Sequence, residues 1–288
     1  MPAIFMDTHI WNYLVEHPNQ TAVQLQQARE SLLEGIREDK WEVICSLPVL
    51  QEILATYRVN PTKFKAINDL LFQAVQNHWL IELKERYVRE LYNRGLLEST
   101  GRYLGRDKRK KIKILANNKK DITDINEITH QEGVDFKAQQ EDARTTVYNA
   151  LGSVDGKTLK NSARAYQQWF ERDRDLRGWV YKALEGGVAR GFYKASLLKE
   201  FTPTKYNSPS IWRYVDYRQA KVKLNLGERR RISESDAVDA DIYGCSPYYD
   251  ILVTQDNDFR KAIELININN DAFELKNFEQ LMQILGVE

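Results

Sequence analysis

Short apolar runs alternate with longer amphipathic segments at both ends of the chain. At the amino-terminal end, an apolar run at 4–6 is followed by an amphipathic segment over 22–38, in which apolar residues recur at helical spacing. A second β-rich run at 41–46 precedes a predicted helix over 49–57, with Pro48 at its first turn. Strands and helices that alternate in this order are typical of a parallel α/β sheet.

The carboxy-terminal end repeats this alternation. A helix is predicted over 233–245, and the continuous apolar run at 251–254 is typical of a central parallel strand that is buried on both faces. A helix over 257–266, a last strand at 272–275 and a closing helix over 277–285 complete the pattern. The two ends of the chain therefore predict two halves of a single α/β domain.

The middle of the chain has a different pattern, since its segments look mainly helical and offer few strand candidates. We therefore predict a discontinuous α/β domain over 1–100 and 232–288, with a mainly helical insertion over 101–231. The insertion carries a dense basic run at 106–113, and such runs either contact nucleic-acid phosphates or form a solvated helix face. The basic residues predicted to contact nucleic acid are Lys108, Arg109, Lys110, Lys111, Arg229, Arg230 and Arg231.

Composition narrows the class of protein. The 42 basic and 41 acidic residues nearly cancel, so charge matters through its local segregation and not through its net value of +1. No apolar stretch approaches the ~20 residues that a membrane-spanning helix requires, and the start of the chain lacks the pattern of a signal peptide. We therefore expect a cytoplasmic location and no membrane contact. Cys45 and Cys245 lack the ligand spacing of a zinc site and are expected to be buried free thiols.

Acidic residues stand where predicted strands end or predicted helices begin. Asp7 ends the first strand, and Asp256 follows the strand at 251–254. Ligands bind outside the carboxyl ends of parallel strands, so these two acids are expected at one edge of the sheet. Helices that leave this edge begin there, which can bring Glu52 and Asp239 to the same cleft.

Crowded carboxylates repel one another, which raises their pKa values unless a cation neutralises them. Hard oxygen ligands without thiolate or imidazole favour Mg²⁺, Mn²⁺ or Ca²⁺, and the natural reaction of such a site is hydrolysis of a phosphodiester. Each acid taken singly has a simpler interpretation, because an Asp after a strand commonly caps a helix and acids at a helix start favour its dipole. A metal site and a set of helix caps are therefore alternatives.

Four segments taken together resemble the PIN-domain family of nucleases. The closest match is 252–259, an apolar strand followed by a Thr-x-Asp turn and an Asp-Phe pair. The opening strand with Asp7 and Thr8 is similar to the family's first element, and 46–53 is similar to the element that carries a Glu early in a helix. The segment 236–241 resembles the one that carries the family's third acid.

This resemblance implies a Rossmann-like three-layer α/β fold with a central parallel sheet, and a Mg²⁺- or Mn²⁺-dependent endonuclease that acts on RNA. The residues that it assigns to the metal are Asp7, Glu52, Asp236, Asp239, Asp256 and Asp258. The catalytic set that it implies is Asp7, Glu52, Asp239 and Asp256. Asp236 and Asp239 are rivals for one ligand position, Asp258 is peripheral, and Thr8 and Thr254 support the ligands by hydrogen bonds.

Other functions stay open at this point. A structure-selective DNA nuclease is the alternative enzyme, because related folds act on flaps and the insertion could form a helical arch. A catalytically silent scaffold that binds RNA or a protein through the insertion is the non-enzymatic alternative. The resemblance also allows an inhibitory or regulatory protein partner, as in the toxin–antitoxin branch of the family. The small members of the family have no counterpart of the large insertion.

Overall fold

The computed structural model describes residues 1–118, 122, 206, 209–228, 236–266 and 273–287. The chain divides into two compact units. The first comprises Met1–Ile81, Ser99–His130 and Cys245–Glu288, and the second comprises Glu82–Glu98 and Gln131–Gly244. The first unit therefore combines the two ends of the chain, and residues from the stretch predicted as an insertion belong to both units.

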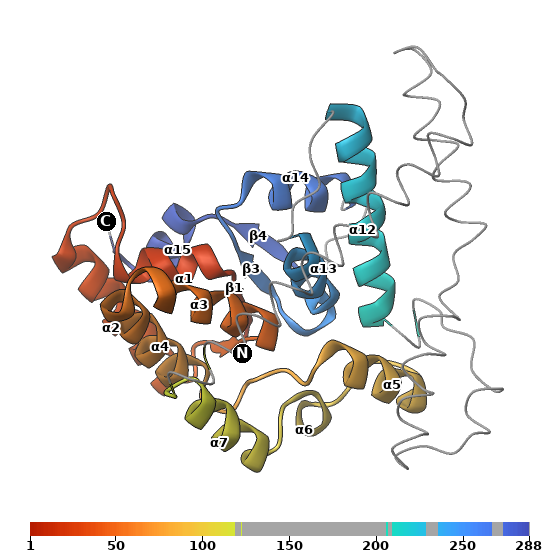
Figure 1. Ribbon diagram of the computed structural model, residues 1–288, viewed down its shortest axis with the longest axis horizontal. Helices are drawn as coiled ribbons and strands as arrows, with labels where there is room; N and C mark the ends of the chain where they lie inside the picture. Colours follow the sequence, from red (N-terminus) through yellow and green to blue (C-terminus); the bar gives the residue numbers. More distant parts are fainter. Residues whose placement is uncertain (119–121, 123–205, 207–208, 229–235, 267–272, 288) are drawn as a thin grey trace. The chain divides into compact units, whose positions relative to one another are not determined.

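Four parallel strands form the sheet of the first unit (Figure 1). They are β1 (Ala3–Met6), β2 (Glu42–Ile44), β3 (Ile251–Val253) and β4 (Glu274–Lys276), in the order β2-β1-β3-β4. Phe5 of β1 is paired with Ile44 on one side and with Leu252 on the other. The predicted parallel α/β sheet is thus confirmed, and β1 and β3, from opposite ends of the chain, are neighbours at its centre.

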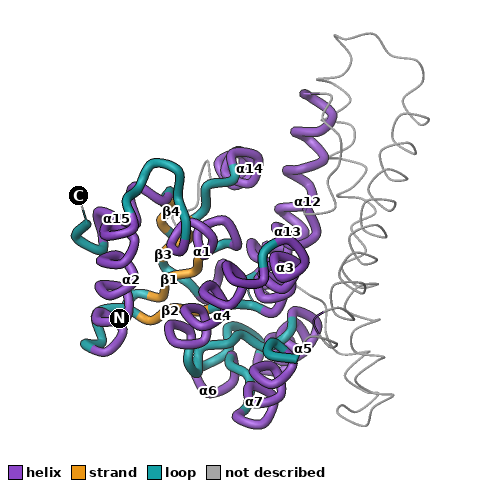
Figure 2. Tube along the Cα trace, turned by 60° about the vertical axis from the view of Figure 1, so that its left-hand side comes forward, coloured by secondary structure: helices purple, strands orange, loops and turns teal. Residues whose placement is uncertain are grey.

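Helices connect and cover these strands. They are α1 (Thr8–Val15), α2 (Ala22–Arg37), α3 (Leu47–Val59), α4 (Pro61–Val75), α6 (Ser99–Arg102), α7 (Arg106–Leu115), α14 (Asn257–Ile266) and α15 (Phe278–Ile284), with a 3₁₀ turn at Ser246–Tyr248. A capping box formed by Thr21 and Gln24 opens α2, and Pro48 lies in the first turn of α3. Helices α1 and α4 pack against each other and against α2 and α3 (Figure 2).

The centre of the sheet is the core of the first unit. All four residues of β1 are buried, and Phe5 and Met6 have no exposed surface. Because side chains alternate between the two faces of a strand, this pattern requires packing on both faces. The fully buried Trp11 of α1 donates from its indole Nε1 to the Met6 carbonyl at 3.2 Å, which fastens the first helix to the first strand.

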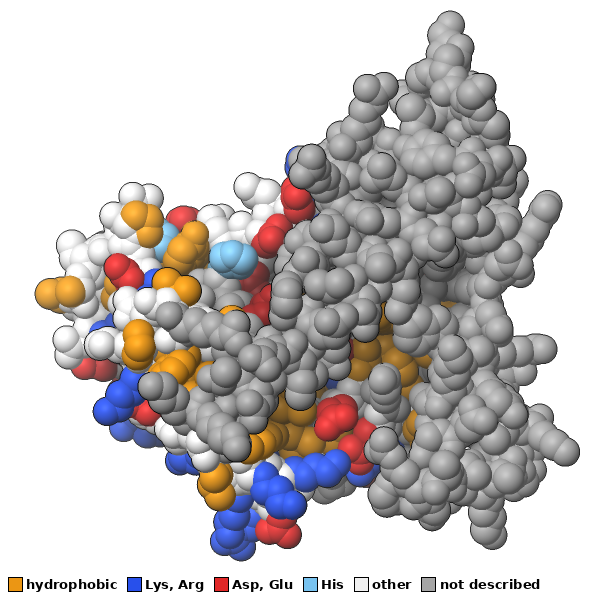
Figure 3. Space-filling view, in the orientation of Figure 1, with side chains coloured by type: hydrophobic (Ala, Val, Ile, Leu, Met, Phe, Trp, Pro, Cys, Tyr) orange, Lys and Arg blue, Asp and Glu red, His pale blue; other side chains and the backbone are white. Residues whose placement is uncertain are grey.

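Long-range contacts attach α6 to this sheet. Leu80 and Tyr103 form an isolated antiparallel bridge. The buried Glu42 carboxylate accepts hydrogen bonds from Arg102 Nη2 at 2.9 Å and from the Tyr103 hydroxyl at 3.1 Å. Helix α7 follows directly and carries a group of Lys and Arg side chains on the surface (Figure 3).

The second unit, as far as it is described, consists of helices α5 (Leu83–Asn93), α12 (Pro209–Glu228) and α13 (Asp236–Gly244). Helix α12 packs against both α5 and α13. The fully buried Glu90 accepts hydrogen bonds from the backbone N–H of Ser210 at 3.0 Å and from its hydroxyl at 2.5 Å, which joins α5 to the start of α12. Tyr217 and Tyr243 join α12 to α13, with ring centroids 5.9 Å apart.

Two expectations drawn from composition can be compared with the structure. Cys45 and Cys245 are both buried free thiols, as predicted. Burial raises the pKa of the Cys45 thiol, so this side chain behaves as a small apolar residue and not as a nucleophile. Among the described helices, none is long and apolar enough to cross a membrane.

Candidate active site

Asp7 ends β1 and opens α1. Its Oδ1 accepts a hydrogen bond from the backbone N–H of Ile10 at 3.1 Å, which makes it the N-cap of the helix. Its own N–H donates to the Val253 carbonyl at 3.1 Å, so the end of β1 is aligned with the end of β3. Only 4% of Asp7 is exposed. The carboxylate is therefore held rigidly at the carboxyl edge of the sheet.

Thr254 connects two of the predicted site acids. This fully buried residue directly follows β3, and its hydroxyl donates to Asp7 Oδ2. The same hydroxyl oxygen accepts a hydrogen bond from the Asp256 N–H at 3.1 Å. The structure thus brings Asp7 and Asp256 together at one sheet edge, through the threonine that the resemblance assigned to a supporting role.

Asp256 also caps a helix. Its Oδ1 accepts hydrogen bonds from the N–H groups of Asp258 at 2.7 Å and Phe259 at 2.9 Å, at the start of α14. Its second oxygen, Oδ2, accepts no hydrogen bond within the described ranges. Asp258 lies in the first turn of α14, where its charge favours the helix dipole.

Glu52 reaches the same edge from the interior of α3. Its Oε2 accepts a hydrogen bond from the Thr8 hydroxyl at 2.5 Å, and Oε1 accepts none from the part of the chain that the structure describes. Thr8 is the first residue of α1, and its side chain is turned toward Glu52 instead of capping the helix. Both predicted threonine contacts, from Thr8 and Thr254, are therefore made to predicted site acids.

The three carboxylates influence one another electrostatically. Burial raises the pKa of Asp7, and the negative charge of Asp256 raises it further, while the Thr254 hydrogen bond opposes both. Burial also raises the pKa of Glu52, and the charges of Asp7 and Asp256 add to this effect. Crowding of negative charge, which the sequence predicted, is thus a property of this edge.

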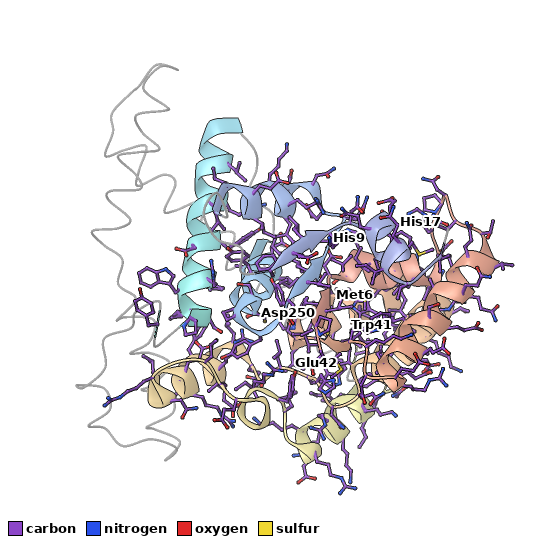
Figure 4. The ribbon with its side chains drawn as sticks, turned by 180° about the vertical axis from the view of Figure 1, so that it is seen from behind. Met6, His9, His17, Trp41, Glu42 and Asp250 are labelled. Atoms are coloured by element: carbon purple, nitrogen blue, oxygen red, sulfur yellow. The ribbon has the colours of Figure 1, made fainter. Side chains whose placement is uncertain are left out.

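His9 is a further neighbour of this cluster, which the pattern of acidic residues did not indicate. It lies in the first turn of α1, is exposed, and lowers the pKa of both Asp7 and Glu52 through its positive charge when protonated. Figure 4 shows Met6 between His9 on one side and Glu42 on the other. His9 therefore lies beyond the carboxyl end of β1, whereas Glu42 begins β2 at the other edge of the sheet. In the sequence, its position two residues after Asp7, at the start of a predicted helix, could have indicated that it lies near the acidic residues.

The donor chemistry of this edge fits a hard divalent cation. A cation would relieve the repulsion among Asp7, Glu52 and Asp256. Asp7 uses both oxygens in hydrogen bonds, whereas Glu52 Oε1 and Asp256 Oδ2 are free of them among the described residues. No group of three or more His, Cys, Asp or Glu side chains in the described ranges is arranged to hold an ion directly. Two free carboxylate oxygens suit Mg²⁺, which keeps several waters and is usually held by one or two carboxylates.

The remaining predicted ligands belong to the second unit. Asp236 is the first residue of α13. Asp239 lies one turn later, where its Oδ2 accepts a hydrogen bond from the Tyr217 hydroxyl of α12 at 3.1 Å. The resemblance made these two residues rivals for one ligand position, and that assignment stays a prediction.

The predicted nucleic-acid contacts are divided between described and undescribed residues. Lys108, Lys110 and Lys111 are exposed on α7. Arg109 is partly buried, and its guanidinium donates to the Leu104 carbonyl at 2.5 Å. The other three predicted contacts, the arginines at 229–231, lie outside the described residues.

Comparison of the chain with protein-family models, with curated proteins and with solved structures finds no match. The α/β class with a four-stranded parallel sheet follows from the structure itself.

Proposed function

We propose that the first unit is a divalent-cation-dependent nuclease of the PIN type, which hydrolyses phosphodiester bonds in RNA. One observation carries the proposal: a single buried hydroxyl, that of Thr254, links Asp7 and Asp256, and Glu52 lies within electrostatic reach of both. The carboxyl edge of a parallel sheet is the position at which open α/β folds bind their ligands. The three-layer arrangement of the PIN family is the architecture that this proposal expects.

Glu52 and Asp256, each with an oxygen that accepts no hydrogen bond among the described residues, would hold the cation directly together with water, and Asp7 would supply negative charge beside them. When bound, Mg²⁺ or Mn²⁺ supplies Lewis-acid stabilisation of charge on a phosphate group and lowers the pKa of water. The raised pKa values of Asp7 and Glu52 support a bound cation, because their ionised forms are unfavourable in this setting without a positive charge. Ligation by Asp236 or Asp239, with Asp258 as a peripheral acid, remains part of the prediction from the resemblance.

The side chains of this edge have distinct roles in the proposed reaction. Asp7 is fixed by donors from Thr254 and Ile10, so its position is set before a substrate arrives. Glu52 is anchored through Oε2 by Thr8, which leaves Oε1 as the oxygen that would bind the cation.

A catalytically silent scaffold is the second candidate, and one observation favours it. Asp7 caps α1 and Asp256 caps α14, so both acids have a structural role that needs no metal. This interpretation leaves Glu52 without an explanation. Glu52 lies inside α3 and not at its end, and its burial beside like charges is unfavourable.

A cleavage assay tests the proposal. End-labelled single-stranded RNA, single-stranded DNA and flap DNA are each incubated with the protein in Mn²⁺, in Mg²⁺ and in EDTA. We expect cleavage of RNA that requires the metal and is lost in Asp7→Asn. Preferential cleavage of flap DNA would assign the site to a DNA nuclease, and no cleavage of any polymer would favour the silent scaffold.

A further inference from the structure

Helix α7 presents a strongly basic surface on the first unit. Six of its ten residues are Lys or Arg and only one, Asp107, is acidic. Arg106, Lys110 and Lys113 follow one another at intervals of four and three residues, so they share one face of the helix. All three are exposed, no residue of α7 is buried, and Lys and Arg side chains gather in this region of the surface (Figure 3).

The described carboxylates do not form ion pairs with the charges of this face. Arg106, Lys110, Lys111 and Lys113 form no ion pair with any residue in the described part of the chain. The surface of a typical small domain intersperses charges of both signs. The concentration of one sign on α7 therefore exceeds what a solvated helix face requires.

Contacts at both ends of α7 fix the direction of this face. The Arg109 guanidinium is turned inward and donates to the Leu104 carbonyl at 2.5 Å. At the other end, the Asn117 side chain donates to the Lys113 carbonyl at 2.6 Å and closes the last turn. With Arg109 turned toward its own loop, Arg106 and Lys110 are left to face solvent.

An open hollow of about 780 Å³ lies beside the last turn of α7. The residues that line it are Lys110, Lys113, Ile114, Asn117 and Asn118. Two ammonium groups and side-chain amides thus face one space, and each supplies N–H donors of the kind that phosphate oxygens accept.

We propose that α7 binds the phosphate backbone of a nucleic-acid strand, at a place separate from the carboxylate site. The choice of nucleic acid among polyanions rests on the proposed function. From Arg106 to Lys113 the face extends ~10 Å along the helix axis, at a rise of ~1.5 Å per residue. That length corresponds to about three phosphates of one strand of a duplex, at an axial rise of ~3.4 Å each. A membrane-surface helix would need apolar residues along its whole length, whereas those of α7, Ile112, Ile114 and Leu115, are confined to its last four positions.

The test measures binding without cleavage. A fluorescent oligouridylate is titrated with Asp7→Asn protein in EDTA, and anisotropy gives the affinity between ~50 and ~200 mM salt. The double variant Lys110→Gln/Lys113→Gln is compared with Lys110→Arg/Lys113→Arg and with a control pair on the same unit, Lys40→Gln/Lys65→Gln. Because hydrolysis plays no part, failure of this proposal is distinguishable from failure of the nuclease proposal.

Loss of two phosphate contacts is expected to reduce the slope of log affinity against log salt by about 1.4, and the affinity near ~0.1 M salt by about 20-fold. The arginine pair and the control pair should keep the slope of the Asp7→Asn parent. An unchanged slope in the glutamine pair would overturn the proposal, as would an equal loss in the control pair. Binding to phosphatidylserine vesicles but not to RNA would overturn it in favour of a membrane surface.

Discussion

Replacement of Thr254 by Val should destabilise the first unit and loosen its acidic edge. Val has nearly the shape of Thr but lacks the hydroxyl. The substitution leaves Asp7 Oδ2 without its donor and the Asp256 N–H without its acceptor, at a site where Thr254 has no exposed surface. Thr254→Ser is the matched control, because it keeps the hydroxyl and removes only a methyl group.

The magnitude follows from the two hydrogen bonds. A bond to a charged carboxylate contributes about 1.5–3 kcal/mol and one between neutral groups about 0.5–1.5 kcal/mol, so Thr254→Val should cost about 2–4 kcal/mol. For a chain of this size, that loss corresponds to a fall in Tm of roughly 3–7 °C. The serine variant should lose only about 1 kcal/mol, the cost of one buried methyl group.

Denaturant unfolding monitored by tryptophan fluorescence measures this difference. Trp11 is fully buried next to the site and bonded to the Met6 carbonyl, so it reports on the first unit. The Thr254 hydrogen bond lowers the pKa of Asp7, so its loss raises that pKa further. The deficit should therefore be largest at neutral pH and shrink as pH falls and Asp7 becomes protonated. Stabilities of the Val and Ser variants within about 0.5 kcal/mol of each other at pH 7 would refute the role of the hydroxyl.

Three further predictions concern charge in the first unit. The raised pKa values of Asp7 and Glu52 give stability that is present at low pH and lost as pH rises through the folded pKa values. Because a bound cation offsets the cost of ionising these carboxylates, Mn²⁺ should raise the Tm at pH 7 more than at pH 5. Mn²⁺ at ~100 times its Kd would add about 2.7 kcal/mol to the free energy of unfolding. Asp7→Asn, which keeps the helix cap, should lose this gain in a thermal-shift titration. Glu42→Gln removes the negative charge that accepts a hydrogen bond from Arg102 and should cost about 2 kcal/mol in denaturant unfolding. Glu38→Gln, at an exposed ion pair, should cost clearly less. Burial lowers the pKa of His78, so the contribution of its neutral form to stability is present above the unfolded value of 6.5 and lost as pH falls through the folded value. His78→Gln should therefore flatten the dependence of stability on pH below 6.5. An unchanged pH profile in this variant would contradict the prediction.

The sheet and its acidic edge could be predicted from local pattern, because short apolar runs and helix starts are encoded in neighbouring residues. The run at 251–253 is apolar throughout and is followed by Thr254, and β3 is indeed a central strand. Parallel topology then places Asp7 and Asp256 at one edge without knowledge of any side-chain contact.

The features that pattern could not supply depend on contacts between distant residues. Thr8 and Asp7 both have the chemistry of an N-cap, and what distinguishes them is the bond from Thr8 to Glu52, 44 positions away. Likewise, the attachment of α6 to the sheet depends on the hydrogen bond from Arg102 to Glu42, which joins residues far apart in the sequence and has no local pattern. The position of the Asp239 side chain on α13 also depends on tertiary packing, because its carboxylate accepts a hydrogen bond from Tyr217 of α12.

The rate of metal-dependent RNA cleavage in three single variants tests the central claim most directly. Asp7→Asn and Asp256→Asn change the acidic edge, whereas Asp250→Asn is the matched control, because Asp250 accepts from the Ala3 N–H at 2.7 Å just before β3 begins, at the opposite edge of the sheet. We expect the first two to lose cleavage by about 100-fold or more, as removal of a single electrostatic catalytic group commonly does, and the control to keep the parental rate. Equal rates in all three variants and the parent would contradict the claim that this edge is the active site.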